Sequence, residues 1–277
     1  MRETSRPLRT ILGQYANYVR SAVPLRTFLP KVTLSITKGD FLIRTAENWK
    51  DVESVLKLRY EVFLREGLNL NFPLGMDVDR WDALADHLMV IDTRNGALIG
   101  TYRLISSSFS NDFYSQSEFE LAPFLTTLGG KLELSRACIK AEYRSTAAIS
   151  LLWRGIAAYA NAVGARYLFG CASIKSMDRN VADQLVGYFK KEGCFEERPG
   201  VAPHANFKMP DAKPRTEPAP PISVREAIPP LLGSYLRAGA KVLCEPALDR
   251  SFKCLDFLTV LDFANINAAF ERRYLSS

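Results

Sequence analysis

The sequence lacks the features that mark several common classes of protein. It has two histidines, five cysteines and no C-x-x-C pair, so we do not expect a Cys/His zinc site. No uncharged stretch reaches the roughly 18 apolar residues of a membrane span. Residues 1–30 lack the continuous apolar segment of a signal peptide. The odd number and wide spacing of the cysteines therefore indicate reduced thiols in the cytoplasm.

Excess positive charge is also missing from most of the chain. The 277 residues carry a formal charge of +6, and residues 1–38 hold seven Lys and Arg against one Glu, so residues 39–277 are neutral. A nucleic-acid-binding body normally shows a basic face, so we expect no nucleic-acid partner. Apolar residues recur at helical spacing over 8–22, which predicts a basic amphipathic helix in this N-terminal extension. Two alternatives remain open for this helix: it packs on residues 39–277, or it contacts anionic lipid headgroups.

The remaining pattern predicts an α/β (α+β) domain over residues 39–277, with a mixed central sheet flanked by helices. Strands are expected at 41–45, 87–92, 97–106, 132–139 and 167–172, and helices at about 47–66, 145–164 and 179–192. Residues 199–221 hold seven of the fifteen prolines and are interpreted as an extended excursion. Residues 222–277 form a C-terminal extension, predicted to be rich in strands, whose two apolar runs are expected to complete the sheet.

Short motifs carry more specific information than this order of elements. In chain order they are Leu58-Arg59-Tyr60-Glu61-Val62-Phe63, Asp77-Val78-Asp79-Arg80-Trp81-Asp82, Gly100-Thr101-Tyr102-Arg103, Glu133-Leu134-Ser135-Arg136 and Glu142-Tyr143-Arg144. Together, over about residues 42–262, they resemble the bacterial ornithine-lipid N-acyltransferases. That group is related to the GNAT acyltransferases and includes N-acyl amino acid synthases. A more distant resemblance is to the acyl-homoserine-lactone synthases.

The resemblance implies a GNAT-like fold and a defined reaction. A fatty acyl group, usually 3-hydroxylated, would pass from acyl carrier protein to the α-amine of ornithine and give a lyso-ornithine lipid. The phosphopantetheine thioester of the carrier would be a co-substrate, so no resident cofactor and no metal are expected. Beside a lipid product, the basic extension suggests peripheral contact with the anionic inner face of the cytoplasmic membrane.

The charged motifs suggest how ornithine would bind. The candidate substrate-binding residues are Arg59, Asp77, Asp79, Asp82 and Arg103. The arginines would hold the carboxylate of ornithine and the aspartates its δ-ammonium. Two other interpretations of the aspartates stay open: a solvated acidic loop, or a helix-capping cluster paired with Arg59 and Arg80.

Glu133 and Arg136 are the candidate catalytic residues. Glu133 would take the proton of the α-amine, directly or through water; alternatively, it only pairs with Arg136 or Arg103. Side chains three apart on a strand point to opposite faces unless a bulge lies between them. A bulge here would also free backbone N–H groups over 137–139 to hold the thioester oxygen.

The segment after this strand is expected to receive the acyl donor. The candidate residues are Cys138, Ile139, Lys140, Arg144 and Ser145. Arg144 opens a helix, whose first amides can receive a phosphate. In the usual GNAT signature for coenzyme A, Ala147 stands in place of the first glycine and Ile149 in place of the last small residue. The backbone would approach a pyrophosphate less closely, which favours a carrier-protein donor. Carrier proteins are acidic, so the basic side chains would face them, unless they are ordinary surface charges.

Two other functions remain open at this stage. The acceptor amine could belong to glycine, lysine or tyrosine instead of ornithine. A protein of a different class, a non-catalytic, hemolysin-like membrane-active protein, has only the basic N-terminal helix in its favour.

Overall fold

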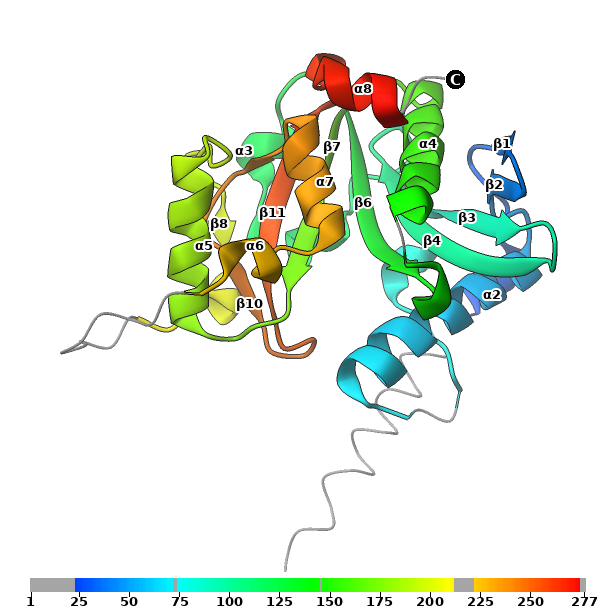
Figure 1. Ribbon diagram of the computed structural model, residues 1–277, viewed down its shortest axis with the longest axis horizontal. Helices are drawn as coiled ribbons and strands as arrows, with labels where there is room; N and C mark the ends of the chain where they lie inside the picture. Colours follow the sequence, from blue (N-terminus) through cyan, green and yellow to red (C-terminus); the bar gives the residue numbers. More distant parts are fainter. Residues whose placement is uncertain (1–22, 72–73, 145, 212–221, 275–277) are drawn as a thin grey trace, which may run out of the picture. The chain divides into compact units, whose positions relative to one another are not determined.

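The structure is a computed structural model that describes residues 23–71, 74–144, 146–211 and 222–274 (Figure 1). The expected helix over 8–22 and Ser145 lie outside the described residues. The chain divides into two compact units: Met1–Ile105 with Arg136–Tyr159, and Ser106–Ser135 with Ala160–Ser277. Within the described residues, none of the helices has the length and apolar character needed to cross a membrane.

The first unit is built on an antiparallel run of strands. Its order is β1 (Ser35–Lys38), β2 (Phe41–Thr45), β3 (Asp86–Asp92) and β4 (Ala97–Ser106). β4 lies beside the end of β6 (Gly130–Ile139), where the Lys140 amide donates to the Ile99 carbonyl at 2.8 Å. The strands expected over 41–45 and 97–106 are confirmed residue for residue, whereas β1, inside the basic extension, was not expected.

Two long helices cover this part of the sheet (Figure 1). α2 (Trp49–Arg59) begins where the Asn48 side chain accepts the amides of Lys50 and Asp51. It continues as a π-helix, η2 (Tyr60–Glu66), so the helix expected over 47–66 changes geometry after Arg59. The residues of α4 (Thr146–Ala162) that belong to this unit pack closely on β3, because a Cβ at Gly155 would lie 2.7 Å from Leu88. Short 3-10 turns are η1 (Pro24–Thr27), η3 (Arg80–Ala83) and η5 (Ala141–Tyr143).

The second unit has its own strands. The first half of β6 pairs in parallel with β7 (Ala165–Ile174), which pairs antiparallel with β11 (Cys254–Asp262). β10 (Ala247–Asp249) and β9 (Lys241–Val242) also pair with β11. β5 (Phe119–Glu120) and β8 (Ala202–Pro203) form a separate two-stranded sheet. The two C-terminal apolar runs therefore do join the sheet, as β9 and β11.

Helices of the second unit pack against these strands (Figure 1). They are α3 (Ala122–Leu125), α5 (Arg179–Lys191), α6 (Val224–Ala227), α7 (Pro230–Ala238) and α8 (Ala268–Tyr274), with 3-10 turns η4 (Tyr114–Ser117), η6 (Ala205–Phe207) and η7 (Phe263–Asn265). Leu185 and Phe189 of α5 share a core with Leu232 of α7 and Phe257 of β11. The C-terminal extension is thus helical as well as stranded, which corrects the expectation of a largely stranded end.

Candidate active site

Three arginines and three aspartates of the first unit form one ion-pair network. Arg59 ends α2, Arg103 lies in β4 and Arg136 in β6, while the segment leading into and through η3 supplies the aspartates. The network aspartates are Asp77, Asp79 and Asp82. Elements far apart in the sequence therefore bring together six of the predicted site residues.

Arg59 is a fully enclosed member of the network. Its Nε donates to Asp77 Oδ2 at 2.8 Å and its Nη1 to Asp82 Oδ1 at 2.6 Å. The Arg59 side chain has no exposed surface. One guanidinium thus holds two carboxylates through charge-assisted hydrogen bonds, the strong kind.

Arg103 and Arg136 complete the network around Asp79. Arg103 Nη1 donates to Asp79 Oδ1 at 2.6 Å and lies 3.2 Å from Asp82 Oδ1. Arg136 Nη2 donates to Asp79 Oδ2 at 3.1 Å, and its Nε lies 3.3 Å from Asp77 Oδ2. Three guanidinium groups therefore balance three carboxylates.

Two of the aspartates also cap the short helix η3. The Asp79 side chain accepts the Trp81 amide at 2.9 Å, and Asp82 Oδ2 accepts the Asp79 amide at 2.8 Å. This reciprocal pair is a capping box, which the D-x-x-D spacing allows. Of the open interpretations, helix capping with Arg59 pairing is therefore the arrangement observed, whereas Arg80 lies over the Trp81 ring.

Burial and charge act against each other in this network. Burial favours the neutral carboxyl of Asp79, but Arg103, Arg136 and Arg59 outweigh it and hold its pKa well below the ordinary value. The pKa of Asp77 is lowered in the same way, chiefly by Arg59. Nearby His87 is fully buried, and burial lowers its pKa to about 4, so its ring is neutral near pH 7 and leaves the charge balance unchanged.

Accessibility divides the network into a closed part and an edge. The side chains of Arg59, Arg103 and Asp82 have no exposed surface. The side chains of Asp79 and Arg136 are 19% and 12% exposed. Asp79 and Arg136 therefore form the partly exposed edge of the network.

Glu133 lies on β6 in the second unit. Its two carboxylate oxygens accept the backbone amides of Ser115 and Tyr114 at 2.7 and 2.8 Å. The side chain therefore holds the start of η4, a positioning role that the sequence did not suggest. Its role as general base stays a prediction.

Arg136 interrupts the regular conformation of β6. Its φ is +52°, in the left-handed region that non-glycine residues seldom adopt. Such strain is found mostly at functional sites. The register shift of β6 against β7 lies between Gly130 and Lys131, so a bulge between Glu133 and Arg136 stays a hypothesis.

The residues predicted to bind the acyl donor come soon after Arg136 in the sequence. Burial raises the pKa of the Cys138 thiol to about 12, which makes it a poor nucleophile at neutral pH. Ile139 ends β6, and Lys140 pairs with Glu142 at 3.4 Å. Arg144 Nη2 donates to Glu66 Oε2 at 2.6 Å. The side chains of Lys140 and Arg144 are more than 40% exposed, so both are accessible to another molecule. Their role in binding the acyl donor stays a prediction.

Comparison with known proteins places this geometry in a family. Residues 58–154 match the acetyltransferase (GNAT) domain family, which confirms the expected GNAT-like fold. Two solved structures are more distant. The acyl-homoserine lactone synthase LasI has 15% sequence identity and a TM-score of 0.47, and the match covers 88% of this chain and 95% of that one. FeeM, an N-acyl amino acid synthase from uncultured soil microbes, has 9% identity and a TM-score of 0.46, and the match covers 81% of this chain and 93% of that one.

Two curated relatives are much more similar in sequence. The L-ornithine N(alpha)-acyltransferase of Rhizobium meliloti (strain 1021) is 30% identical over 93% of this chain and 90% of its own length. The enzyme of the same name from Agrobacterium fabrum (strain C58) is 31% identical over 86% and 85%. The resemblance of the motifs is confirmed: the chain belongs to the family of the L-ornithine N(alpha)-acyltransferases.

Proposed function

We propose that this protein is an N-acyltransferase that joins a fatty acyl group, usually 3-hydroxylated, to the α-amine of ornithine and forms a lyso-ornithine lipid. The observation that carries the proposal is the family membership, with identity that extends over 85% or more of each relative's length. The hemolysin-like alternative has only the basic N-terminal helix in its favour, and that helix lies outside the described residues.

The acyl donor in this proposal is the thioester of acyl carrier protein, a co-substrate and not a resident cofactor. Ala147 and Ile149 stand where the coenzyme A signature has small residues, which weakens the case for coenzyme A. The exposed Lys140 and Arg144 offer positive charge to an acidic carrier. Peripheral contact with an anionic membrane, through residues 1–38, belongs to the same proposal.

Ornithine would bind by exchanging partners with the edge of the network. Its carboxylate takes the guanidinium of Arg136, and its δ-ammonium takes the carboxylate of Asp79. The 3.1 Å pair between these two residues opens, while Arg59 and the closed part of the network stay in place. Each charge then keeps an opposite partner, so the exchange leaves no buried charge unpaired.

The chemical step is a direct attack on the thioester. The α-amine forms the C–N bond, the C–S bond breaks, and the pantetheine thiol leaves with a proton. A general base takes the proton from the amine, and Glu133, directly or through water, remains the candidate that the sequence suggests. In this proposal, the backbone N–H groups over 137–139, which follow the left-handed residue Arg136, stabilise the developing oxyanion.

The test is a reconstituted reaction followed by mass spectrometry. Purified full-length protein is incubated with 3-hydroxyacyl carrier protein and ornithine, and in parallel with glycine, lysine or tyrosine. We expect N-acyl ornithine as the main product. A product with another amino acid alone would correct the acceptor, and no product with any chain length or with an acyl-coenzyme A would refute acyl transfer.

A further inference from the structure

Two buried carboxyl groups of the second unit, which we call the acid pair, take no part in the proposed reaction. Glu118 directly follows η4 and is 1% exposed, and Asp256 on β11 is 3% exposed. The two side chains are hydrogen-bonded to each other. An ionised carboxylate only accepts hydrogen bonds. A hydrogen bond between two carboxyl groups therefore requires a proton on one of them.

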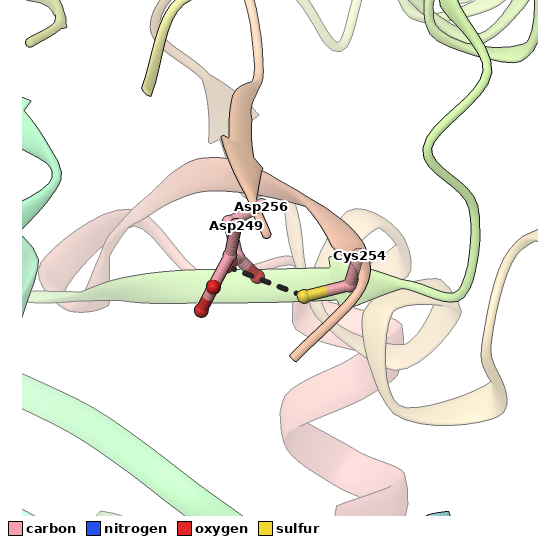
Figure 2. Close-up of side chains that lie close together, drawn as sticks. All are labelled: Asp249, Cys254 and Asp256. Atoms are coloured by element: carbon pink, nitrogen blue, oxygen red, sulfur yellow. Dashed lines mark hydrogen bonds between the residues drawn. The ribbon is translucent and has the colours of Figure 1, made fainter. Parts of the chain in front are cut away.

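The strand register explains why Asp256 lies among acidic neighbours. Asp249 is paired with Cys254 in the β10–β11 hairpin. Cys254 and Asp256 are two apart on β11 and therefore share a face of the sheet. Figure 2 shows these three side chains close together, with the Cys254 sulfur facing a carboxylate oxygen of Asp256. The leading charged neighbours of both members of the acid pair are acidic, so the pair carries like charges unless it holds a proton.

The hydrogen bonds favour Glu118 as the site of this proton. Asp256 Oδ1 accepts the hydroxyl of Ser173, and Asp256 Oδ2 faces the Cys254 thiol at 3.5 Å, so both of its oxygens have donors. Glu118 Oε2, in contrast, is buried, and no donor among the described residues reaches it. A buried polar atom without a partner is costly. A protonated Glu118 is itself a donor and can bond to the Asp256 carboxylate.

Groups from several elements face the acid pair. η4 supplies Tyr114, which hydrogen-bonds with Glu118. β7 supplies Cys171, whose leading charged neighbours are both members of the acid pair and then Glu133 of β6. Burial raises the pKa of Cys171 and of Cys254 well above the ordinary thiol value, so both thiols are neutral near pH 7. Loss of a proton from the acid pair therefore adds negative charge beside other acidic groups.

The segment around η4 is held from several sides. The backbone amide of His204, which follows β8, donates to the Glu118 carbonyl at 2.8 Å, and its Nε2 lies 3.0 Å from the Gln116 carbonyl oxygen. The Glu133 carboxylate accepts the first amides of η4 from the side of β6. The acid pair supplies the link between this segment and β11, and it is the link that a change in protonation would break.

We propose that Glu118 and Asp256 share one proton at neutral pH and form a pH-sensitive contact between η4 and β11. With the proton in place, Glu118 donates to the Asp256 carboxylate and the contact is made. When the proton is lost at alkaline pH, two adjacent buried carboxylates repel each other. Glu118 then separates from Asp256, and η4 loses its link to β11. The proposal does not depend on which amino acid is acylated.

The environment of Glu118 determines the sign of the pH dependence. Burial, and then Asp256 and Asp249, raise the pKa of Glu118 well above the value of about 4.3 that it has in an unfolded chain. The contribution of such a group to stability is fully present below the unfolded pKa and is lost as the pH rises through the folded pKa. The folding equilibrium constant should therefore fall with rising pH in this interval, by up to about tenfold per pH unit from this group.

Glu118→Gln tests the shared proton, because an amide replaces the protonated carboxyl group and still donates to Asp256. Full-length proteins are unfolded in urea and followed by circular dichroism. We expect the folding constant of the variant, divided by that of the wild type, to rise at least about tenfold between about pH 6 and pH 8. Glu120→Gln is the matched control on β5, an exposed carboxylate whose replacement should leave this ratio constant. A constant or falling ratio for Glu118→Gln would refute the proposal.

Infrared spectroscopy detects the proton in the wild-type protein itself, so the test does not depend on how well the variant folds. A protonated carboxyl group has a C=O band apart from the bands of a carboxylate. We expect this band near neutral pH and its loss in Glu118→Gln but not in Glu120→Gln. At alkaline pH the wild-type band should disappear while the amides of Tyr114 and Ser115 exchange hydrogen faster, after correction for the intrinsic rate. The proposal is wrong if the band is missing near neutral pH, or if the amides stay equally protected once it has disappeared.

Discussion

Arg59 offers the sharpest test of the ion-pair network. Arg59→Ala removes a fully buried cation and leaves Asp77 and Asp82 without its three hydrogen bonds. Breaking a buried ion pair from one side costs about 3–5 kcal/mol, since the remaining charge has lost its solvation without compensation. Asp82 keeps Arg103 at 3.2 Å and Asp77 keeps Arg136 at 3.3 Å. We therefore expect Arg59→Ala to lower the free energy of unfolding by an amount near the lower end of this range.

The assay is guanidinium unfolding followed by tryptophan fluorescence. All three tryptophans, Trp49, Trp81 and Trp153, belong to the first unit, so their fluorescence reports on the unit that contains the network. Arg65→Ala is the matched control, because Arg65 follows on the same helical segment but is 67% exposed and pairs with Glu61, which is itself exposed. Arg65→Ala should lower the free energy of unfolding by no more than about 0.5 kcal/mol. A loss below about 1 kcal/mol for Arg59→Ala would refute the view that the network holds this unit together.

Three further predictions follow from single contacts. In thermal melts, Gly170→Ala should destabilise the protein by about 1–3 kcal/mol, because the added Cβ would lie 2.2 Å from the Leu134 carbonyl oxygen. The control Gly187→Ala should be neutral or stabilising, because its added Cβ would have nothing within 4 Å. The lowered pKa values of Asp77 and Asp79 raise the free energy of unfolding, and this contribution is fully present above the unfolded pKa of about 3.9. It is lost as the pH falls below that value, so a free energy of unfolding that stays constant from pH 5 to pH 2 would contradict this. Asp79→Asn should raise the KM for ornithine about tenfold or more by removing a charged partner, with the KM for the acyl donor unchanged in steady-state assays; an unaltered ornithine KM would exclude Asp79 as the ammonium partner.

The regular elements were predictable because their signals are local. The strand over 41–45 is set by a short apolar run, and the one over 97–106 by the preceding Asn95-Gly96 turn. The π-helical geometry after Arg59 was not predictable, because the apolar positions of the segment suit either helix. α7 was missed although Pro230 at its first turn and Gly239 at its end, with φ of +107°, are ordinary helix signals.

The candidate site was predictable in its membership but not in its pairing. The D-x-x-D spacing of Asp79 and Asp82 already allows a capping box. That Arg103 and Arg136 reach Asp79 depends on how β4 and β6 are placed in the sheet, which no local pattern encodes.

Charge balance in the network bears on which form of the substrate the proposed site accepts. The α-amine of a peptide terminus titrates near pH 8 and a side-chain amine near 10.4, so the α-amine of a diamino acid loses its proton before the side-chain amine. Ornithine with a free α-amine then carries one negative and one positive charge. That form replaces the contact between Asp79 and Arg136 with two new ion pairs and leaves the site neutral. The α-ammonium form adds a positive charge for which the balanced network has no further carboxylate. Glycine with a free amine brings only its carboxylate, which would give the three arginines four carboxylates to balance. The network thus favours the nucleophilic form of a diamino acid over glycine by charge alone.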